Sequence, residues 1–247
     1  MTRPPRNPSA AIVIIGAEVL SAKVRDANGP YLLERLRAQG IDVIELRVIG
    51  DSIEVIAETV RALSARVDYL FTTGGIGPTH DDVTIGGIAQ AFDREIIEHP
   101  FLVEKLEEHF GHTVDERVRS LCRVPDGTHV EMVRGKLPLF RYENVFILPG
   151  IPSLVEMCFE YLSPSLPSST FVEHKLMVRV SESEIATHLA RVQERYGSEV
   201  QIGSYPKKNE AGRYVEITVD GRDQALVDRA LLHIQEGLRE DWVIDVQ

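Results

Sequence analysis

Short apolar runs alternate with amphipathic helical patterns along the first part of the chain, and this alternation limits the possible folds more than any other feature. Ala11–Ile15 and Val43–Ile49 are predicted strands, the first a near-continuous apolar run typical of strands buried on both faces. Tyr31–Leu36 and Ile53–Leu63 carry helical periodicity, and Val67–Thr73 is a third predicted strand. This β-α-β-α-β order predicts an α/β fold with a mainly parallel sheet and helices on both faces.

The pattern restarts after a segment that has the composition of a linker, Ser163–Ser169. Before the linker, residues 95–127 are predicted to be mostly helical, with short strands near His129–Val133 and Val145–Leu148. After it, strands and helices follow in the order β-α-β-β-α-β, which is typical of a split βαβ module. The predicted organisation is a flexible tail over 1–10, a large α/β domain over 11–163 and a small α+β domain over 171–247.

Charge and composition argue against several classes of partner. The formal net charge is −11, a field that repels nucleic acid and anionic lipid, so neither is an expected partner. Arg3 and Arg6 precede an apolar run that is too short for a signal peptide, and no stretch approaches transmembrane length. Cys122 and Cys158 are too few for a disulfide framework and are predicted to be buried thiols. We expect a cytoplasmic protein.

The loop after the third predicted strand carries the strongest chemical signal. Glycines within Gly74–Gly77 let the backbone approach a ligand, and the start of the next helix favours anions. The chain has no GxxxxGK[ST], so the loop is not a P-loop. It is not a dinucleotide fingerprint either, because His80 stands where the third glycine would be. Asp81 and Asp82 would repel a phosphate unless a divalent cation lay between them. The alternative is that Asp82 caps the helix and Asp81 is solvated.

Other residues at the same predicted edge of the sheet are further candidates. Glu18 follows the first strand and is either a second metal or hydroxyl partner or a surface residue. His80 either assists proton transfer or is an exposed loop residue. The turn Leu148–Pro152 places Gly150 between a strand and a helix, where it forms either a wall of the pocket or a plain connection.

Histidine and lysine pairs elsewhere are weaker candidates. His109 and His112 lie three residues apart but lack a third metal ligand in the sequence. Lys207 and Lys208 could contact phosphates, although most such pairs are solvated.

The small C-terminal domain invites comparison with RNA-binding modules of the KH kind. KH modules clamp nucleotides with a GxxG loop, and no GxxG occurs from Phe171 to Gln247. We therefore predict that this domain does not bind RNA. It is predicted to serve oligomerisation or to close the pocket, with Tyr205 and Lys207 nearest the ligand.

The segment Thr72–Thr84 resembles the signature of the molybdopterin-binding (MoaB/Mog-type) domain. It is most similar to the branch found in CinA-like proteins and in the N-terminal half of eukaryotic FAD synthase. The resemblance covers nearly the whole chain. Supporting matches are Gly16-x-Glu18-Val19-Leu20, Asp26-x-Asn28, Gly50-Asp51, Leu148-Pro149-Gly150-Ile151-Pro152 and, after the linker, Gly203-Ser204-Tyr205-Pro206.

This resemblance implies a three-layer αβα domain that binds a pterin or a nucleotide, and homo-oligomers in many members. In the CinA and FAD-synthase branch it also implies metal-dependent pyrophosphatase activity on ADP-ribose or FAD. The cation could be Mg, Mn or Co, and molybdopterin is a possible ligand. The predicted catalytic and metal-binding residues are Asp82, Asp81 and Glu18. The predicted ligand-binding residues are Asn28, Thr73, Gly74, Gly75, Gly77, Thr79, His80, Gly150, Tyr205 and Lys207.

One feature of the chain keeps an alternative open. Ala17 stands where the family commonly has an aspartate, which favours a non-catalytic binder of molybdopterin or a nucleotide. A role in molybdenum-cofactor synthesis is a third possibility. Because the chain ends at Gln247, neither FAD synthesis nor the amidase activity of longer CinA proteins is expected.

Overall fold

A computed structural model of the protein describes residues 7–110, 115–209 and 212–246. The chain divides into two compact units, Met1–Pro167 and Ser168–Gln247. Each unit has its own hydrophobic core. Within the described ranges, every helix is too short or too polar to cross a membrane.

The first unit contains a six-stranded mixed sheet in the order β2-β1-β3-β8-β7-β6. The pairs β1–β2, β1–β3 and β3–β8 are parallel, which confirms the predicted mainly parallel sheet, whereas β7 and β6 add an antiparallel edge. The strands are β1 (Ser9–Ile15), β2 (Asp42–Ile49), β3 (Tyr69–Thr73), β6 (His129–Val133), β7 (Leu137–Tyr142) and β8 (Val145–Leu148).

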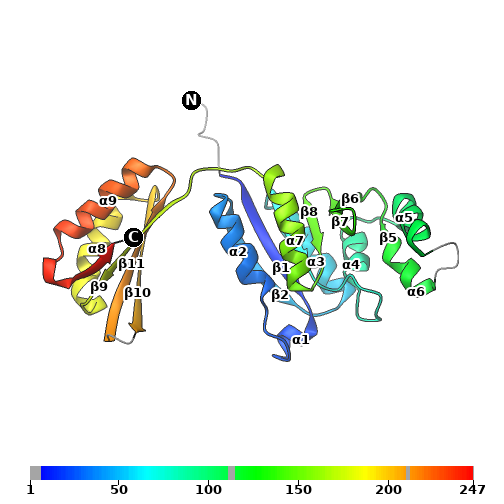
Figure 1. The fold of residues 1–247 in the computed structure, drawn as a ribbon, viewed down its shortest axis with the longest axis horizontal. Helices are drawn as coiled ribbons and strands as arrows, with labels where there is room; N and C mark the ends of the chain where they lie inside the picture. Colours follow the sequence, from blue (N-terminus) through cyan, green and yellow to red (C-terminus); the bar gives the residue numbers. More distant parts are fainter. Residues whose placement is uncertain (1–6, 111–114, 210–211, 247) are drawn as a thin grey trace. The chain divides into compact units, whose positions relative to one another are not determined.

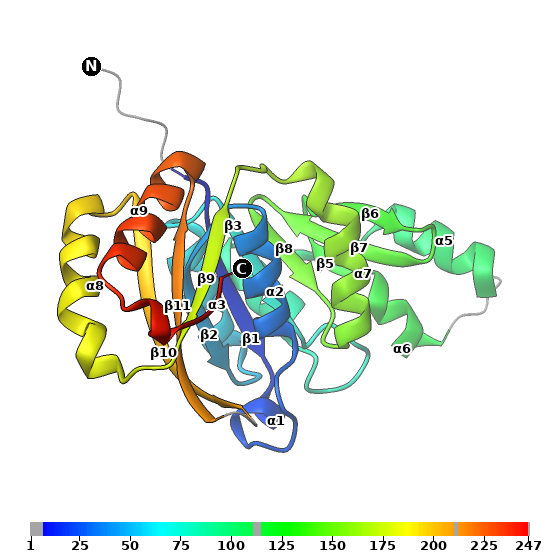
Figure 2. The ribbon, with the colours of Figure 1, turned by 60° about the vertical axis from the view of Figure 1, so that its left-hand side comes forward.

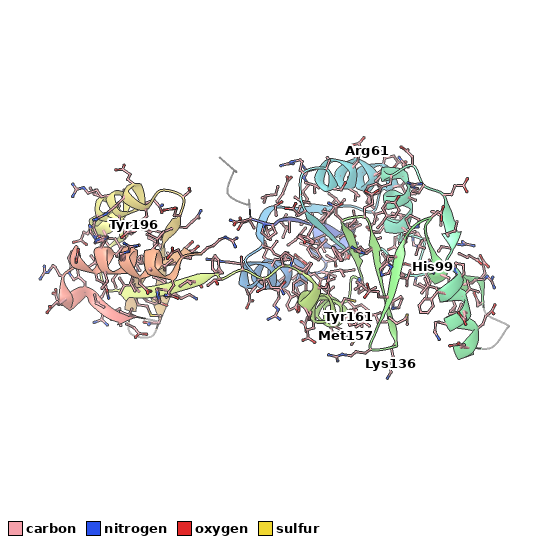
Figure 3. The ribbon with its side chains drawn as sticks, turned by 90° about the horizontal axis from the view of Figure 1, so that it is seen from above. Arg61, His99, Lys136, Met157, Tyr161 and Tyr196 are labelled. Atoms are coloured by element: carbon pink, nitrogen blue, oxygen red, sulfur yellow. The ribbon has the colours of Figure 1, made fainter. Side chains whose placement is uncertain are left out.

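Helices cover both faces of this sheet, so the unit has the three-layer αβα architecture (Figure 1). One hydrophobic cluster packs α2 and α7 on one face, and a second packs α3, α4 and α5 on the other. Arg61 on α3 and Met157 on α7 mark the two outer layers in Figure 3. The helices are α1 (Ala17–Leu20), α2 (Asn28–Ala38), α3 (Ile53–Ser64), α4 (Thr84–Ala91), α5 (Pro100–Phe110), α6 (Glu116–Arg119) and α7 (Pro152–Leu162), with 3-10 turns η1 (Ser120–Cys122) and η2 (Ser163–Ser165).

Both ends of the first unit extend further than the sequence predicts. β1 begins at Ser9, inside the predicted tail, because the Asp68 carboxylate accepts hydrogen bonds from both the Ser9 N–H and its hydroxyl, each at 2.8 Å. At the other end, Leu166 lies in the predicted linker but is buried in the α2–α7 cluster. The predicted N-terminal tail and the predicted linker were therefore both too long.

The prediction of mostly helical structure over 95–127 is partly wrong. α5 and the α6–η1 segment are helical, but β4 (Ile96–Glu98) and β5 (Arg123–Pro125) pair as an antiparallel two-stranded sheet. β7 was also missed, because its apolar residues are nearly continuous and show no clear alternation. Cys122 and Cys158 are buried free thiols, as predicted, and burial raises the pKa of Cys158 to about 11.

The second unit is a four-stranded antiparallel sheet with two helices on one face (Figure 2). Its strand order, β10-β11-β9-β12, is that of the predicted split βαβ module. A capping box between Ser181 and Glu184 begins the first helix, and the Asp223 side chain caps the second. The elements are β9 (Val172–Val178), α8 (Glu182–Tyr196), β10 (Val200–Asn209), β11 (Gly212–Gly221), α9 (Gln224–Glu236), the 3-10 turn η3 (Glu240–Trp242) and β12 (Val243–Val246).

Candidate functional site

A cavity of about 630 Å³ lies in the first unit where β1, β3 and β8 end. These strands are parallel neighbours, so their carboxyl ends meet at one edge of the sheet, where ligands bind in open α/β folds. The volume lies within the range of small-molecule sites. Eight of the predicted site residues line the cavity: Glu18, Asn28, Thr73, Gly74, Gly75, Gly77, Asp82 and Gly150.

The loop after β3 turns at two glycines whose backbone conformation other residues rarely adopt. Gly74 and Gly75 have φ values of 101° and 64°. A Cβ on Gly74 would lie 2.1 Å from the carbonyl oxygen of Ile15, and one on Gly75 would lie 2.4 Å from the Thr84 hydroxyl. That hydroxyl donates to the Gly74 carbonyl at 2.8 Å, which ties the start of α4 to the loop.

Three successive backbone N–H groups of this loop lack partners in the described part of the chain. The N–H groups of Gly75, Ile76 and Gly77 donate to none of the residues that the structure describes. All three residues line the cavity. Successive N–H groups around a left-handed residue form a concavity that binds anions, so the loop can receive a phosphate.

Asp82 closes the loop instead of capping the helix, which excludes the capping alternative. Its Oδ2 accepts hydrogen bonds from the Thr79 N–H at 2.8 Å and from the Thr79 hydroxyl. The residue at the N-cap of α4 is Val83, without a side-chain cap. A Cβ on Gly77 would lie 2.7 Å from Asp82 Oδ2, so this glycine provides space for the carboxylate.

Asp81, His80 and Thr79 do not line the cavity. The side chains of His80 and Asp81 are 99% and 63% exposed, and His80 Nδ1 lies 3.9 Å from Asp81 Oδ1. The Thr79 hydroxyl also contacts Asp81 Oδ1 at 2.6 Å, and this hydrogen bond is the main reason that the pKa of Asp81 is lowered. Of the two adjacent aspartates, only Asp82 is therefore at the cavity.

Glu18 reaches the cavity from α1, the single helical turn after β1. Its carboxylate lies against Gly16, where a Cβ would be 2.5 Å from Glu18 Oε1. The Ala17 N–H donates to Asp51 Oδ2 at 2.7 Å. The carboxylate of Asp51, which follows β2, therefore lies next to Ala17 and contacts its backbone N–H. The sequence showed Gly50-Asp51 only as a supporting match and did not assign Asp51 this contact.

Asn28 joins three separate segments at the cavity. Its Nδ2 donates to the Thr73 hydroxyl and to the Gly150 carbonyl, both at 2.8 Å, and Thr73 Oγ1 donates to the Pro149 carbonyl. Asn28 is only 6% exposed, and its Oδ1 has no hydrogen-bond partner among the described residues. The matched motifs at 26–28, 73–77 and 148–152 are thus parts of one connected structure.

The apolar wall of the cavity was not predicted from the sequence. Leu137, Pro138 and Phe140 come from the β6–β7 hairpin, whose turn carries Lys136 in Figure 3, and Leu121 comes from η1. These residues lie in regions that were predicted to be helical or left without an element. The signal that could have found them is the apolar run Leu137–Phe140 after the Gly135 turn.

Tyr205 and Lys207 lie on β10 in the second unit. A Cβ on Gly203 would lie 2.7 Å from the Tyr205 ring, so Gly203-Ser204-Tyr205-Pro206 pairs a glycine with the ring that lies over it. Lys207 Nζ contacts Glu216 Oε1 at 2.6 Å, and this ion pair raises the pKa of Lys207. The nearness of both residues to a ligand stays a prediction, as do oligomerisation and the lack of RNA binding.

The predicted three-carboxylate metal site is not assembled. Among the side chains that the structure describes, no three from His, Cys, Asp and Glu are grouped so that they could hold a metal ion. Glu18 and Asp82 both line the cavity, and Asp81 does not. His112 and the side chain of His109 fall outside the described residues.

The fold and the cavity define a three-layer α/β domain with a pocket at the ends of its parallel strands, joined to a small split βαβ module. The chain belongs to the family described as the probable molybdopterin binding domain, whose model matches residues 11–168. The model of the middle domain of FAD synthase matches residues 170–247. Both the predicted family and the predicted fold are therefore confirmed.

The known proteins to which this chain is similar differ in how much of their length it covers. A protein of Archaeoglobus fulgidus is 34% identical over 230 residues, 93% of this chain and 97% of the relative. A probable FAD synthase of Caenorhabditis elegans is 30% identical over 96% of this chain, which spans only 51% of that relative. The crystal structure of the protein CinA of Thermoplasma acidophilum has a TM-score of 0.59 at 21% identity, covering 64% of this chain and 99% of that one. This last similarity concerns the fold alone.

Proposed function

We propose that the first unit hydrolyses the diphosphate bond of a nucleotide such as FAD or ADP-ribose with the help of a divalent cation. The observation that carries the proposal is the coincidence of an anion-binding loop and two carboxylates in one cavity. The unpartnered N–H groups of Gly75, Ile76 and Gly77 favour a phosphate, whereas Glu18 and Asp82 repel it. The two sets are compatible when a cation lies between carboxylate and phosphate.

The donor set suits a hard cation that the substrate helps to hold. Mg²⁺ is usually bound by one or two carboxylates together with substrate phosphates and water, so it does not require a three-carboxylate group. Glu18 and Asp82 are the residues that would hold it. The bound cation would neutralise charge on the diphosphate and lower the pKa of a coordinated water.

The chain's own residues would bind and orient the diphosphate. The loop N–H groups would hold the phosphoryl oxygens, and the field of the α4 N-terminus adds to them. The wall formed by Leu121, Leu137 and Phe140 would pack against the heterocycle and keep water from that side. The names of the relatives support a flavin nucleotide, since one is a probable FAD synthase and the second unit matches a FAD synthase domain.

A second function, non-catalytic binding of molybdopterin or a nucleotide, is favoured by one observation. Asp81, one of the three carboxylates predicted to hold the cation, lies outside the cavity. Asp26 does line the cavity, but its carboxylate accepts hydrogen bonds from the N–H groups of Asn28 and Gly29 at the start of α2. Glu18 and Asp82 are therefore the two acidic side chains available to a cation. Binding without turnover would identify this alternative.

The test is hydrolysis of FAD and ADP-ribose, followed by chromatography of the mononucleotide products, with Mg²⁺, Mn²⁺ or Co²⁺ and with excess chelator. We expect products with at least one cation and none in the chelator, because the carboxylates and the diphosphate then repel each other. Full activity in chelator would refute the metal role. Tight binding with no products under any condition would favour the non-catalytic alternative.

A further inference from the structure

The loop between α1 and α2 brings a positive charge to the cavity. Arg25 is an exposed residue of this loop, and among the described residues that line the cavity it is the only cationic one. The protein carries a net charge of −11, so a cation at this position is not part of a general basic surface. Sequence analysis did not single Arg25 out, since no motif contains it.

Arg25 has no partner among the residues that the structure describes. No hydrogen bond or ion pair joins its side chain to any residue that the structure describes. Its acidic neighbour Asp26 is occupied elsewhere, because Asp26 Oδ1 accepts the Asn28 N–H at 2.9 Å and the Gly29 N–H at 3.2 Å at the start of α2. The guanidinium is therefore available to a ligand.

We infer that Arg25 binds the diphosphate of the substrate in the cavity that Glu18 and Asp82 also line. This inference rests on the proposed function. A guanidinium offers a planar fork of donors that matches two phosphoryl oxygens, and it keeps its charge at every physiological pH. A diphosphate presents two adjacent charged groups, so it should depend on Arg25 more than a monophosphate does. Arg25 thus favours nucleoside diphosphate compounds over mononucleotides, and over neutral pterins without phosphate.

The experiment measures binding of methylenediphosphonate, whose P–C–P link cannot be hydrolysed, by calorimetry with Mg²⁺ present. Arg25→Gln should weaken binding by about 10–100-fold, the range for loss of a hydrogen-bonded charge pair. Arg25→Lys should restore part of the affinity, since it keeps the charge without the fork. Lys23→Gln is the matched control, because Lys23 is exposed in the same loop but does not line the cavity. It should change affinity by less than about twofold, as expected for a screened surface charge.

Kinetics and a monophosphate ligand sharpen the test. Arg25→Gln should weaken AMP binding by a smaller factor than diphosphonate binding, and should raise KM for ADP-ribose more than it lowers kcat. Equal affinity of Arg25→Gln and the wild type for the diphosphonate would overturn the inference, as would an equal loss in Lys23→Gln. So would a wild type that does not bind the diphosphonate. Binding that depends on Arg25 in a protein that cleaves no nucleotide would refute the proposed function and leave the inference intact.

Discussion

The two units use their strand ends in opposite ways. In the first, β1, β3 and β8 run parallel, so three connecting loops meet at one edge and form a cavity. In the second, every neighbouring pair is antiparallel, so strand ends and beginnings alternate along each edge. Only the first arrangement gathers residues from distant motifs at one place.

Paired polar side chains occur in both units, as in Arg119 with Glu98 in the first and Lys207 with Glu216 in the second. In the first unit, Arg25 and the N–H groups of Gly75–Gly77 also lie together at one cavity and have no partner among the described residues. Donors without partners that converge on one cavity indicate a ligand, and for this reason the proposed chemistry is placed in the first unit.

The largest expected effect separates the adjacent aspartates of the loop. Asp82→Asn should reduce turnover by more than about 100-fold, on the order of 3 kcal/mol of transition-state stabilisation, because it removes a charge from the cavity. Asp81→Asn is the matched control and should change turnover less than about threefold, since Asp81 is outside the cavity. Steady-state kinetics on FAD or ADP-ribose, with circular dichroism to verify folding, measures both. Similar losses in the two variants would contradict the structural distinction.

A smaller effect is expected where a glycine provides space. Gly77→Ala would bring a Cβ to 2.7 Å from Asp82 Oδ2 and should displace the carboxylate, lowering turnover by about tenfold, roughly 1.4 kcal/mol. Gly50→Ala is the control, since its nearest neighbour would be Leu20 Cδ1 at an ordinary 3.7 Å. Kinetics and thermal unfolding of both variants test this. If Gly77→Ala keeps full activity, the position of Asp82 is not critical.

The smallest expected effect concerns the stability of the second unit. Gly203→Ala should move the Tyr205 ring, at a cost of about 1 kcal/mol in the free energy of unfolding, the lower end of the range for overpacking. The cost is low because Tyr205 is 52% exposed and can rotate outward.

The same substitution in a Tyr205→Ala background supplies the control. With the ring absent, Gly203→Ala should cost less, since of the three atoms nearest to the new Cβ only the Thr218 hydroxyl oxygen, at 2.9 Å, would remain. Urea unfolding of the four proteins then forms a double-mutant cycle. Additive effects would show that the ring does not lie over the glycine in solution. A large loss of turnover in Gly203→Ala would instead support the prediction that this face contacts the ligand.

Much of the fold could be predicted from the sequence because its determinants are local. Apolar periodicity specified the strands and helices of the α/β alternation and of the split βαβ module. Local capping supports them, since Ser52 caps α3 by accepting the Val55 N–H. The glycine loop could likewise be recognised, since Gly74 and Gly75 need positive φ wherever the chain turns so sharply. These features depend on neighbours within a few residues.

Tertiary structure alone decided which residues belong to the site. Asp81 and Asp82 are equivalent by composition, and only the turn closed by Thr79 brings Asp82 to the cavity. Asn28 meets Gly150 across 122 positions of the chain, and the Ala17 N–H meets Asp51 across 34. Such contacts follow from how the sheet brings strand ends together, which periodicity does not encode. Arg25 carries no local pattern, and the apolar run Leu137–Phe140 shows a strand but not what it faces, so both acquire their role from the cavity that the folded chain forms.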